Sequence, residues 1–210
     1  MHDPYLFTDC NVLRNKLGIK DEEALNIAEV DLTCKAIHDL YLSPINGSYD
    51  FEHFCETHRR IFNIIYDWAG FPRTIHIEKP ERLLAGMSIE YSQPDTIEKD
   101  ITAALSDAHM IKWEQLVIED QAKAVADNLA SLWKIHAFRE GNTRTTVTFF
   151  CDFIESKNIV LDRTLFQQHA KYMRDALVVA TAVYKDGADF RQFKPLLKII
   201  TDSLQRGRIV

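Results

Sequence analysis

The sequence predicts a mainly α-helical protein of one domain with a single small β-hairpin. Most of the chain places apolar residues three and four apart, the spacing that turns one face of a helix toward a core. Gly and Pro are scarce, at 7 and 6 of the 210 residues, which argues against a turn-rich β-sandwich. Residues 73–79 (RTIHIEK) instead alternate apolar and polar side chains as a strand does, so we expect the hairpin there.

The expected helices are mostly amphipathic stretches. Asp50 is a candidate N-cap of the second helix, and Gly70 and Pro72 are expected to end it. Residues 143–157 are apolar on nearly all sides, so this helix is expected to be central and buried. The expected helices span residues 21–42, 51–69, about 95–112, 118–136 and 143–157, 163–185 and 189–205.

No internal repeat, low-complexity run or linker divides the chain. We therefore expect a single domain over residues 1–210. It would consist of an N-terminal segment (1–45) and a core (about 46–205) that contains the hairpin (about 72–95). Four cysteines are widely spaced without a CxxC pair, so we expect them to be reduced and to behave as small core side chains.

The composition excludes several classes of partner. A formal charge of −6 argues against non-specific binding to nucleic acid or to an anionic membrane. The N-terminus lacks the basic and apolar regions of a secretory signal, and no stretch reaches the roughly 18 apolar residues of a membrane span. We expect a cytoplasmic protein; secretion as an effector is compatible with the sequence.

The junction between two expected helices, Ile135–Phe150 (IHAFREGNTRTTVTFF), has more polar residues than a helix boundary needs. Each residue has a structural interpretation when it is taken alone. His136 could be a hydrogen-bonded boundary histidine and Glu140 a solvated carboxylate. Residues 141–143 could be a simple helix cap.

Taken together, these residues resemble a site for phosphate chemistry. A helix N-terminus preceded by Gly141 and Asn142 offers free N–H groups to an anion, and Arg144 can add a fixed positive charge. Glu140 is a hard oxygen ligand suited to Mg²⁺, and His136 is a base with an ordinary pKa near neutrality. No GxxxxGK[ST] motif is present. The pattern favours phosphoryl or nucleotidyl transfer outside the P-loop class.

The same stretch, HAFREGNTR from His136 to Arg144, closely resembles the HxFx(D/E)GN(G)RxxR signature of Fic-domain proteins. Two other segments are similar to the family. Residues 11–18 (NVLRNKLG) resemble its N-terminal segment, and residues 61–73 (IFNIIYDWAGFPR) resemble the helix and turn before its hairpin. The likeness runs from about residue 10 to about residue 200, and it implies a Fic-type helical bundle.

The resemblance implies transfer of AMP from Mg·ATP to a Ser, Thr or Tyr hydroxyl of a protein, which could be the protein itself. By this analogy His136 deprotonates the hydroxyl and Glu140 holds Mg²⁺. Backbone N–H groups of residues 141–143, Thr143 included, would stabilise the α-phosphate. Asn142 and Arg144 would position the phosphates.

The resemblance also gives the hairpin a role. Its free edge would hold the target segment by main-chain pairing, a general mode of peptide recognition. The residues expected to dock the target are Arg73, Thr74, Ile75, His76 and Ile77.

Three residues depart from the family pattern. Ala137 replaces the usual Pro, and Thr143 replaces a common second Gly but is acceptable at a helix start. Val147 replaces the second Arg, which is expected to hold the γ-phosphate. A lost charge-assisted contact of this kind costs about 1.5–3 kcal/mol. We therefore expect weakened γ-phosphate recognition, with nucleotide preference left open.

Val147 also bears on regulation. Many Fic proteins are inhibited by a glutamate that pairs with the second Arg, and here that partner is missing. The SxxxE spacing from Ser48 to Glu52 lies at the start of an expected core helix. We expect no glutamate-clamp autoinhibition. A large gain of activity in Glu52→Gly, with the fold intact, would contradict this.

Other functions remain open at this point. The chain could be a nucleotide-binding or interaction module, or a toxin component with little transfer activity and a small inhibitory partner. Doc-type phosphotransfer is a second alternative, although the intact Glu140-Gly141-Asn142 stretch favours AMP transfer. A helical structural domain is a third. Tyr172 and Arg174 are candidate contacts for the base.

Overall fold

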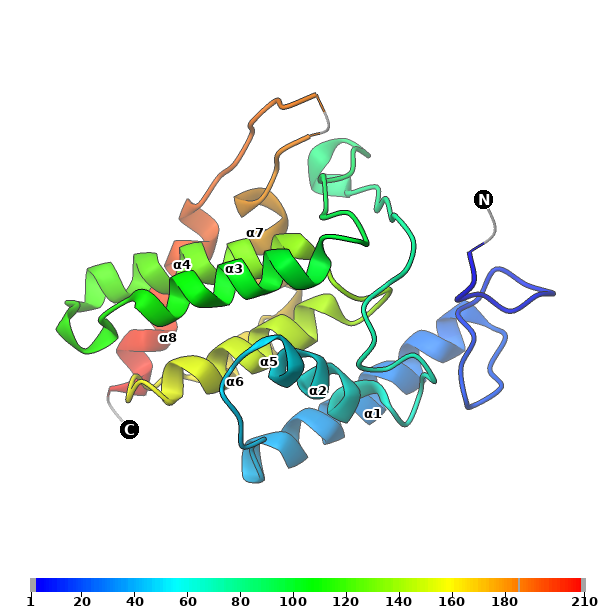
Figure 1. The fold of residues 1–210 in the computed structure, drawn as a ribbon, viewed down its shortest axis with the longest axis horizontal. Helices are drawn as coiled ribbons and strands as arrows, with labels where there is room; N and C mark the ends of the chain where they lie inside the picture. Colours follow the sequence, from blue (N-terminus) through cyan, green and yellow to red (C-terminus); the bar gives the residue numbers. More distant parts are fainter. Residues whose placement is uncertain (1–2, 185, 209–210) are drawn as a thin grey trace.

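The structure is a computed structural model that describes residues 3–184 and 186–208. Eight α-helices and two short 3-10 helices account for most of these residues (Figure 1). The α-helices are α1 (Glu22–Leu42), α2 (Phe51–Phe62), α3 (Ile97–Met110), α4 (Ile118–Ile135), α5 (Asn142–Glu155), α6 (Arg163–Gln168), α7 (Ala170–Ala180) and α8 (Lys194–Gly207). The 3-10 helices are η1 (Arg82–Leu84) and η2 (Trp113–Gln115).

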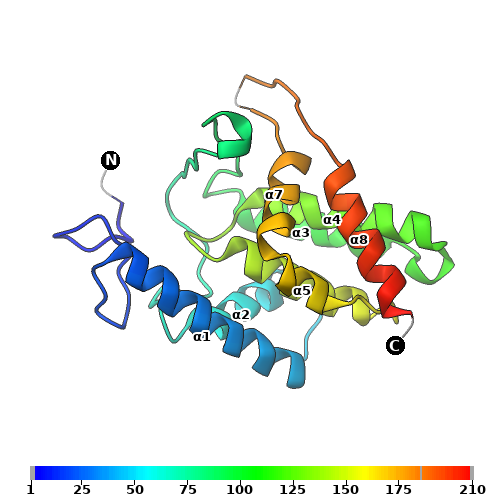
Figure 2. The same ribbon diagram turned by 180° about the vertical axis from the view of Figure 1, so that it is seen from behind.

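Helix α5 is the central element, as its composition predicts. It packs against α2 on one side and α4 on another, while α4 also packs against α3 and α8 (Figures 1 and 2). Phe149, Phe150 and Phe153 of α5 are buried in the main core. Helix α1 lies outside this core on α2. The predictions of a mainly helical fold and of a buried central helix are confirmed.

Helix α2 is shorter than expected, because it ends at Phe62 instead of continuing to Ala69. The N–H groups of Ile65 and Tyr66 both bond to the Phe62 carbonyl, which closes a turn in place of a further helical turn. Tyr66 and Trp68 are buried and stack on each other at 4.3 Å. These aromatic side chains pack against the N-terminal segment, and that packing overrides the local helical pattern.

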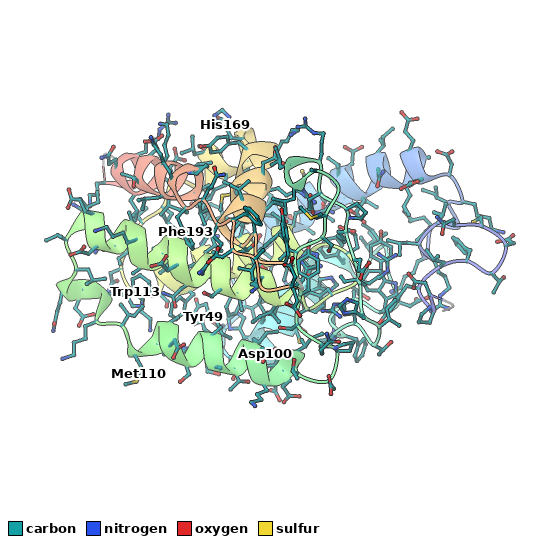
Figure 3. The ribbon with its side chains drawn as sticks, turned by 90° about the horizontal axis from the view of Figure 1, so that it is seen from above. Tyr49, Asp100, Met110, Trp113, His169 and Phe193 are labelled. Carbon is teal, nitrogen blue, oxygen red and sulfur yellow. The ribbon has the colours of Figure 1, made fainter. Side chains whose placement is uncertain are left out.

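The expected helix 163–185 is two helices. The break is at His169, whose φ and ψ are −117° and 35°, and α7 ends at Ala180. His169 is exposed and lies at the edge of the molecule in Figure 3. The last helix begins at Lys194, with Pro195 in its first turn, and not at residue 189.

The expected hairpin does not form a β-ladder. Residues 72–95, here called the flap, run as an irregular arch between α2 and α3 (Figure 1). Within the described residues, the isolated bridges found lie elsewhere, at Leu6–Leu13 and Val183–Asp189. The main chain of the flap arms is bonded in other ways. The Glu90 N–H donates to the Val183 carbonyl outside the flap at 3.1 Å, and the Lys79 N–H donates to a side chain of the opposite arm, the Ser88 hydroxyl, at 3.0 Å.

The cysteines are free, as predicted. Cys55 and Cys151 are buried, and burial raises the pKa of both thiols to about 12. Cys34 is exposed on α1, so it is not the core side chain that was expected. In the described parts of the chain, no helix combines the length and apolar character needed to cross a bilayer.

Candidate active site

The loop of residues 136–141 joins α4 to α5 through two left-handed backbone positions. His136 caps α4 with φ 54°, and Gly141 precedes α5 with φ 82°. A Cβ on Gly141 would lie 2.3 Å from the Phe62 ring. This position therefore requires glycine for its conformation and for its packing.

Three buried polar side chains hold the loop by its backbone. The Asn142 amide donates to the Phe138 carbonyl at 2.7 Å and accepts from the Phe138 N–H at 2.8 Å. The Arg73 guanidinium donates to the His136 carbonyl at 2.8 Å, while the Arg73 N–H donates to the Ala137 carbonyl. Asn142 and Arg73 are thus turned into the loop instead of toward an open site.

His58 is the third support of the loop. Its Nδ1 accepts from the Gly70 N–H at 2.8 Å, so Nε2 carries the proton and donates to the Glu140 carbonyl at 3.1 Å. The ring stacks on Phe138 with centroids 3.8 Å apart. Burial lowers the pKa of His58 to about 3. These contacts give His58 a structural role.

His136 has a different environment. Its ring stacks on Tyr91 of the flap, with ring centroids 4.1 Å apart. It also contacts Trp133 edge-on, with ring centroids 5.2 Å apart. The residue is 4% exposed, yet among the described residues neither ring nitrogen has a hydrogen-bond partner, and neither does the Tyr91 hydroxyl. Burial, followed by the charges of Lys79 and Arg73, holds the pKa of His136 well below its usual value. A neutral imidazole therefore keeps a lone pair available to a ligand.

The N-terminus of α5 has no side-chain cap among the described residues, because its N-cap is Gly141, so the N–H groups of the first turn can serve an anion. Thr143 is half-buried at the first turn, and its hydroxyl accepts from Trp133 Nε1 at 2.9 Å. That hydroxyl can still donate its own proton to a ligand.

Arg144 does not face this opening. Its guanidinium donates to the Thr33 hydroxyl at 2.8 Å and to the Glu29 carboxylate, both on α1, and it lies over the Phe62 ring. Tyr66 donates to the same carboxylate. Phosphate contact by Arg144 would require it to leave Glu29.

Glu140 provides the acidic group of the loop. One carboxylate oxygen accepts from the Gly141 N–H at 2.9 Å, and the other from Lys79 Nζ at 3.1 Å. Burial raises the pKa of Glu140, but Lys79 and the Gly141 N–H outweigh it, and the pKa falls to about 2. The carboxylate is therefore ionised at neutral pH.

The residues fit a Mg²⁺ ion that is shared with a nucleotide. Among the described residues, no group of three or more His, Cys, Asp or Glu could hold a metal by itself. Mg²⁺ commonly takes one or two carboxylates together with substrate phosphates. Glu140, an ionised hard ligand beside an open helix N-terminus, meets that requirement.

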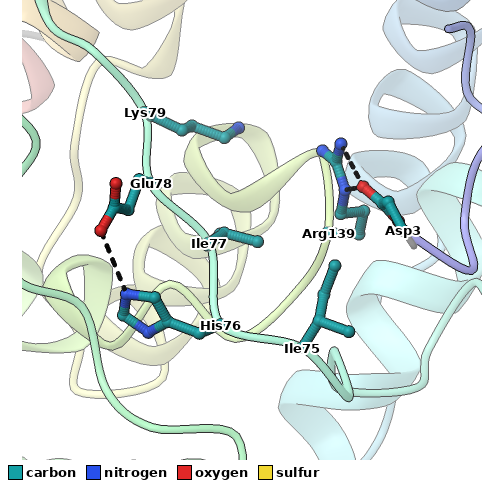
Figure 4. Close-up of a pocket in the computed structure, with 7 residues that line it drawn as sticks. All are labelled: Asp3, Ile75, His76, Ile77, Glu78, Lys79 and Arg139. Atoms are coloured by element: carbon teal, nitrogen blue, oxygen red, sulfur yellow. Dashed lines mark hydrogen bonds and ion pairs between the residues drawn. The ribbon is translucent and has the colours of Figure 1, made fainter. Parts of the chain in front are cut away.

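The flap, the loop and Asp3 of the N-terminal segment line an open cavity of about 240 Å³ (Figure 4). Its lining residues are Asp3, Ile75, His76, Ile77, Glu78, Lys79 and Arg139. Arg139 pairs with Asp3 at 2.9 Å. Thr74 and His76 are exposed whereas Ile77 is buried. Within the described chain, the main-chain groups of His76 and Ile77 bond to no other main-chain group.

Comparison with known proteins identifies the family. A sequence model of the Fic/DOC family matches residues 48–154, just over half of the chain. The chain belongs to the Fic/DOC family. The predicted family resemblance is confirmed.

Curated Fic relatives are similar over most of this chain. The probable protein adenylyltransferase y4lH of Sinorhizobium fredii is 28% identical over 182 residues, which cover 85% of this chain and 88% of y4lH. The protein adenylyltransferase VbhT of Bartonella schoenbuchensis is 29% identical over 148 residues, or 70% of this chain. The match spans only 30% of VbhT, and 37% of a Bartonella henselae adenylyltransferase.

Solved structures support the fold. BepC of Bartonella tribocorum, solved with bound AMPPNP, superposes with a TM-score of 0.77 at 19% identity and covers 95% of both chains. The type IV secretion effector BepA superposes at 0.76 with 24% identity, over 95% of this chain and 67% of BepA. The Fic-type helical bundle is thus confirmed over nearly the whole chain.

The structure brings only some of the predicted site residues together. His136, Glu140, Gly141 and Thr143 lie at one loop and helix start, while Arg144 turns to α1. Val147 lies half-buried against the main core, where it offers no charge.

Sequence reasoning missed Lys79, Tyr91 and Glu29. Lys79 shares the inner side of the alternating segment 73–79 with Ile77, so the pattern itself could have indicated it. No pattern in the sequence indicated Tyr91 or Glu29. Of the two candidate base contacts, Arg174 instead forms a bidentate pair with Glu81 of the flap at 2.7 and 2.9 Å. Tyr172 donates to the Pro195 carbonyl.

Proposed function

We propose that this protein is a protein adenylyltransferase, which transfers AMP from Mg·ATP to a Ser, Thr or Tyr hydroxyl of a protein. The observation that carries the proposal is the buried His136 ring, five residues before the N-cap Gly141. Within the described residues, both of its nitrogens lack a hydrogen-bond partner and no side chain caps the following helix. Relatives named protein adenylyltransferase, and a Fic structure with bound AMPPNP, support the same reaction.

In the proposed reaction, a target hydroxyl loses its proton to His136 as its oxygen attacks the α-phosphorus. The bond to pyrophosphate breaks, and AMP remains as an ester on the target. N–H groups at the start of α5 would stabilise the charge on the α-phosphate, because they point out of the helix along its positive end. The neutral state of His136 suits a proton acceptor.

Glu140 is the residue that would hold Mg²⁺. The ion would neutralise charge on the phosphates as the leaving group departs. Gly141 fixes the carboxylate through its N–H, so the ligand is oriented before the nucleotide binds.

The flap is the proposed docking surface for the target. The unpaired main-chain groups of His76 and Ile77 could accept an added strand, with Thr74 and Ile75 beside them. Arg73 would contribute only indirectly, by holding the loop.

The proposed place of action is the cytoplasm, where ATP is available. Several structural neighbours are described as VirB-translocated Bartonella effector proteins, so delivery into another cell is compatible with this proposal. A small inhibitory partner protein stays a prediction. Copurification of this protein with a small protein encoded by a neighbouring reading frame would support such a partner, and failure to copurify would argue against it.

A nucleotide-binding module with little transfer activity is the second candidate. Val147 favours it, because an uncharged side chain cannot bind the γ-phosphate by an ion pair. We still expect no glutamate-clamp autoinhibition through the second Arg position. Glu52, the candidate glutamate, is exposed at the start of α2.

The test is mass spectrometry after incubation with Mg·ATP and a host lysate. Wild type should add the mass of AMP to itself or to a lysate protein, whereas His136→Ala should not. His38→Ala, an exposed change on α1, should behave as wild type. Val147→Arg should raise the yield about ten- to hundredfold by restoring a charged contact. Nucleotide binding without any adduct, in both wild type and Val147→Arg, would replace the enzyme proposal with the binding module.

A further inference from the structure

Most cations around the loop are committed to partners other than the loop carboxylate. Arg139 pairs with Asp3, Arg144 with Glu29 and Arg174 with Glu81. The buried guanidinium of Arg73 donates to three carbonyls. Each of these guanidinium groups is therefore already fixed by partners other than Glu140.

Lys79 differs from the other cations. Its ammonium lies 3.1 Å from Glu140, the one loop carboxylate suited to a metal, and its side chain is 24% exposed. It comes from the flap, across the cavity from the loop (Figure 4). A flexible four-carbon stem with three donors lets an ammonium change partners by rotation alone.

We propose that Lys79 exchanges partners when nucleotide binds. Without nucleotide, its ammonium is the counterion of Glu140. With Mg·ATP bound, Lys79 moves to a phosphate oxygen of the triphosphate and supplies a positive charge that Val147 does not. This inference rests on the proposed nucleotide site and adds a phosphate-binding residue to it.

The first half of the exchange follows from charge. A metal bound to Glu140 and the Lys79 ammonium would share one carboxylate, and two cations at about 4 Å repel each other. The ammonium must therefore yield its position, and removing it should favour the binding of a divalent ion.

The second half follows from what Lys79 can reach next. Phosphates that shared a metal with Glu140 would lie near that carboxylate, and so within reach of the Lys79 ammonium. The cavity wall also carries Asp3, which is paired with Arg139, and Glu78, which lies 4.0 Å from His76. A triphosphate offers a larger negative charge than either carboxylate. A displaced, partly buried ammonium gains most from an anionic oxygen.

Two binding measurements test the exchange, and the variant Lys79→Met should change the two affinities in opposite directions. Glu140 alone holds a divalent ion only weakly, so Mn²⁺ is titrated to high concentration and followed by the electron paramagnetic resonance signal of the free ion. It should bind Lys79→Met up to about fivefold more tightly than wild type. AMPPNP with Mg²⁺, followed by calorimetry, should bind the same variant about tenfold more weakly. Lys79→Arg, which keeps the charge, should recover AMPPNP binding.

Lys16→Met is the matched control. Lys16 also has a partly exposed ammonium with fixed partners, the carbonyl and side-chain oxygens of Asn63 at 2.7 and 3.0 Å. This variant should change neither measurement.

Either half can fail. Unchanged or tighter AMPPNP binding in Lys79→Met would mean that Lys79 is only a counterion, and unchanged Mn²⁺ binding would mean that it does not compete with the metal; each overturns the exchange. AMPPNP binding that shows the predicted changes, without AMP transfer to any protein, would overturn the adenylyltransferase proposal and leave the exchange standing. If wild type binds no AMPPNP, both fail.

Discussion

Gly141 occupies a position from which both backbone conformation and packing exclude a side chain. The left-handed φ of 82° turns the chain into α5, and the Phe62 ring fills the space of a Cβ. His58 supports the same turn from α2 by donating to the Glu140 carbonyl. The open helix N-terminus thus depends on contacts with α2, about eighty residues earlier in the chain.

Replacing Gly141 by Ala should be costly. The left-handed backbone costs about 1–2 kcal/mol for Ala, and the displaced Phe62 ring about 1–3 kcal/mol more. Urea unfolding should therefore show a loss of about 2–5 kcal/mol for Gly141→Ala. Gly18→Ala is the control: its φ is 70° but its Cβ would meet nothing within 4 Å, so it should lose only about 1–2 kcal/mol. Equal losses would show that Phe62 gives way freely.

The low pKa of His58 predicts a pH dependence of stability. The pKa is about 3 in the folded protein and near 6.5 in the unfolded chain, so between these values only the unfolded chain gains the proton. The contribution of His58 to the free energy of unfolding is full above about pH 6.5. It decreases as the pH is lowered, by up to about 1.4 kcal/mol per pH unit.

Urea unfolding at about pH 7 and about pH 5 measures this slope. His58→Gln should be less stable than wild type at neutral pH and should show a shallower decrease toward acid. The exposed His38→Gln should keep the wild-type slope. An unchanged slope in His58→Gln would mean that other groups cause the acid sensitivity.

At the scale of elements, the sequence predicted the helices well and the flap only in part. Residues 73–79 alternate between buried and exposed as a strand does, yet no ladder forms. The N–H groups of Arg73 and Lys79 bond to the loop and to the Ser88 hydroxyl, and Glu90 in the returning arm bonds to Val183. Periodicity reports which side of a segment is buried. It does not report where the main-chain groups find partners, so the alternation was read correctly and the hairpin was not.

His76 and Ile77, whose main-chain groups bond to no other main-chain group in the described part of the chain, make a prediction of their own. His76→Pro removes one N–H donor from the proposed docking edge, whereas His76→Ala removes the side chain and keeps the donor. Transfer of AMP to a protein target should fall about tenfold in His76→Pro and little in His76→Ala. AMPPNP binding should be unchanged in both. Equal transfer by both variants would argue against main-chain pairing.

Over the whole molecule, the candidate site is assembled from segments far apart in the chain. The loop, the helix start and Val147 could be predicted because they form one continuous motif. Tyr91 on His136, Glu81 on Arg174 and Glu29 on Arg144 could not, because each contact joins residues 45 or more positions apart. Glu29 and Arg174 also lie outside residues 48–154, which match the Fic/DOC family.

Glu29 therefore tests whether α1, outside the matched region, influences the site. Its side chain is 8% exposed and accepts from both Arg144 and Tyr66, so Glu29→Gln should lower the free energy of unfolding by about 1–3 kcal/mol. The variant should also bind Mg·AMPPNP up to about fivefold more tightly, because Arg144 is then released from a charged carboxylate to meet the phosphates. The exposed Asp31→Asn on the same helix should change neither value. If Glu29→Gln loses stability without gaining affinity, Arg144 serves to fasten α1 to α5, and the nucleotide is bound without it.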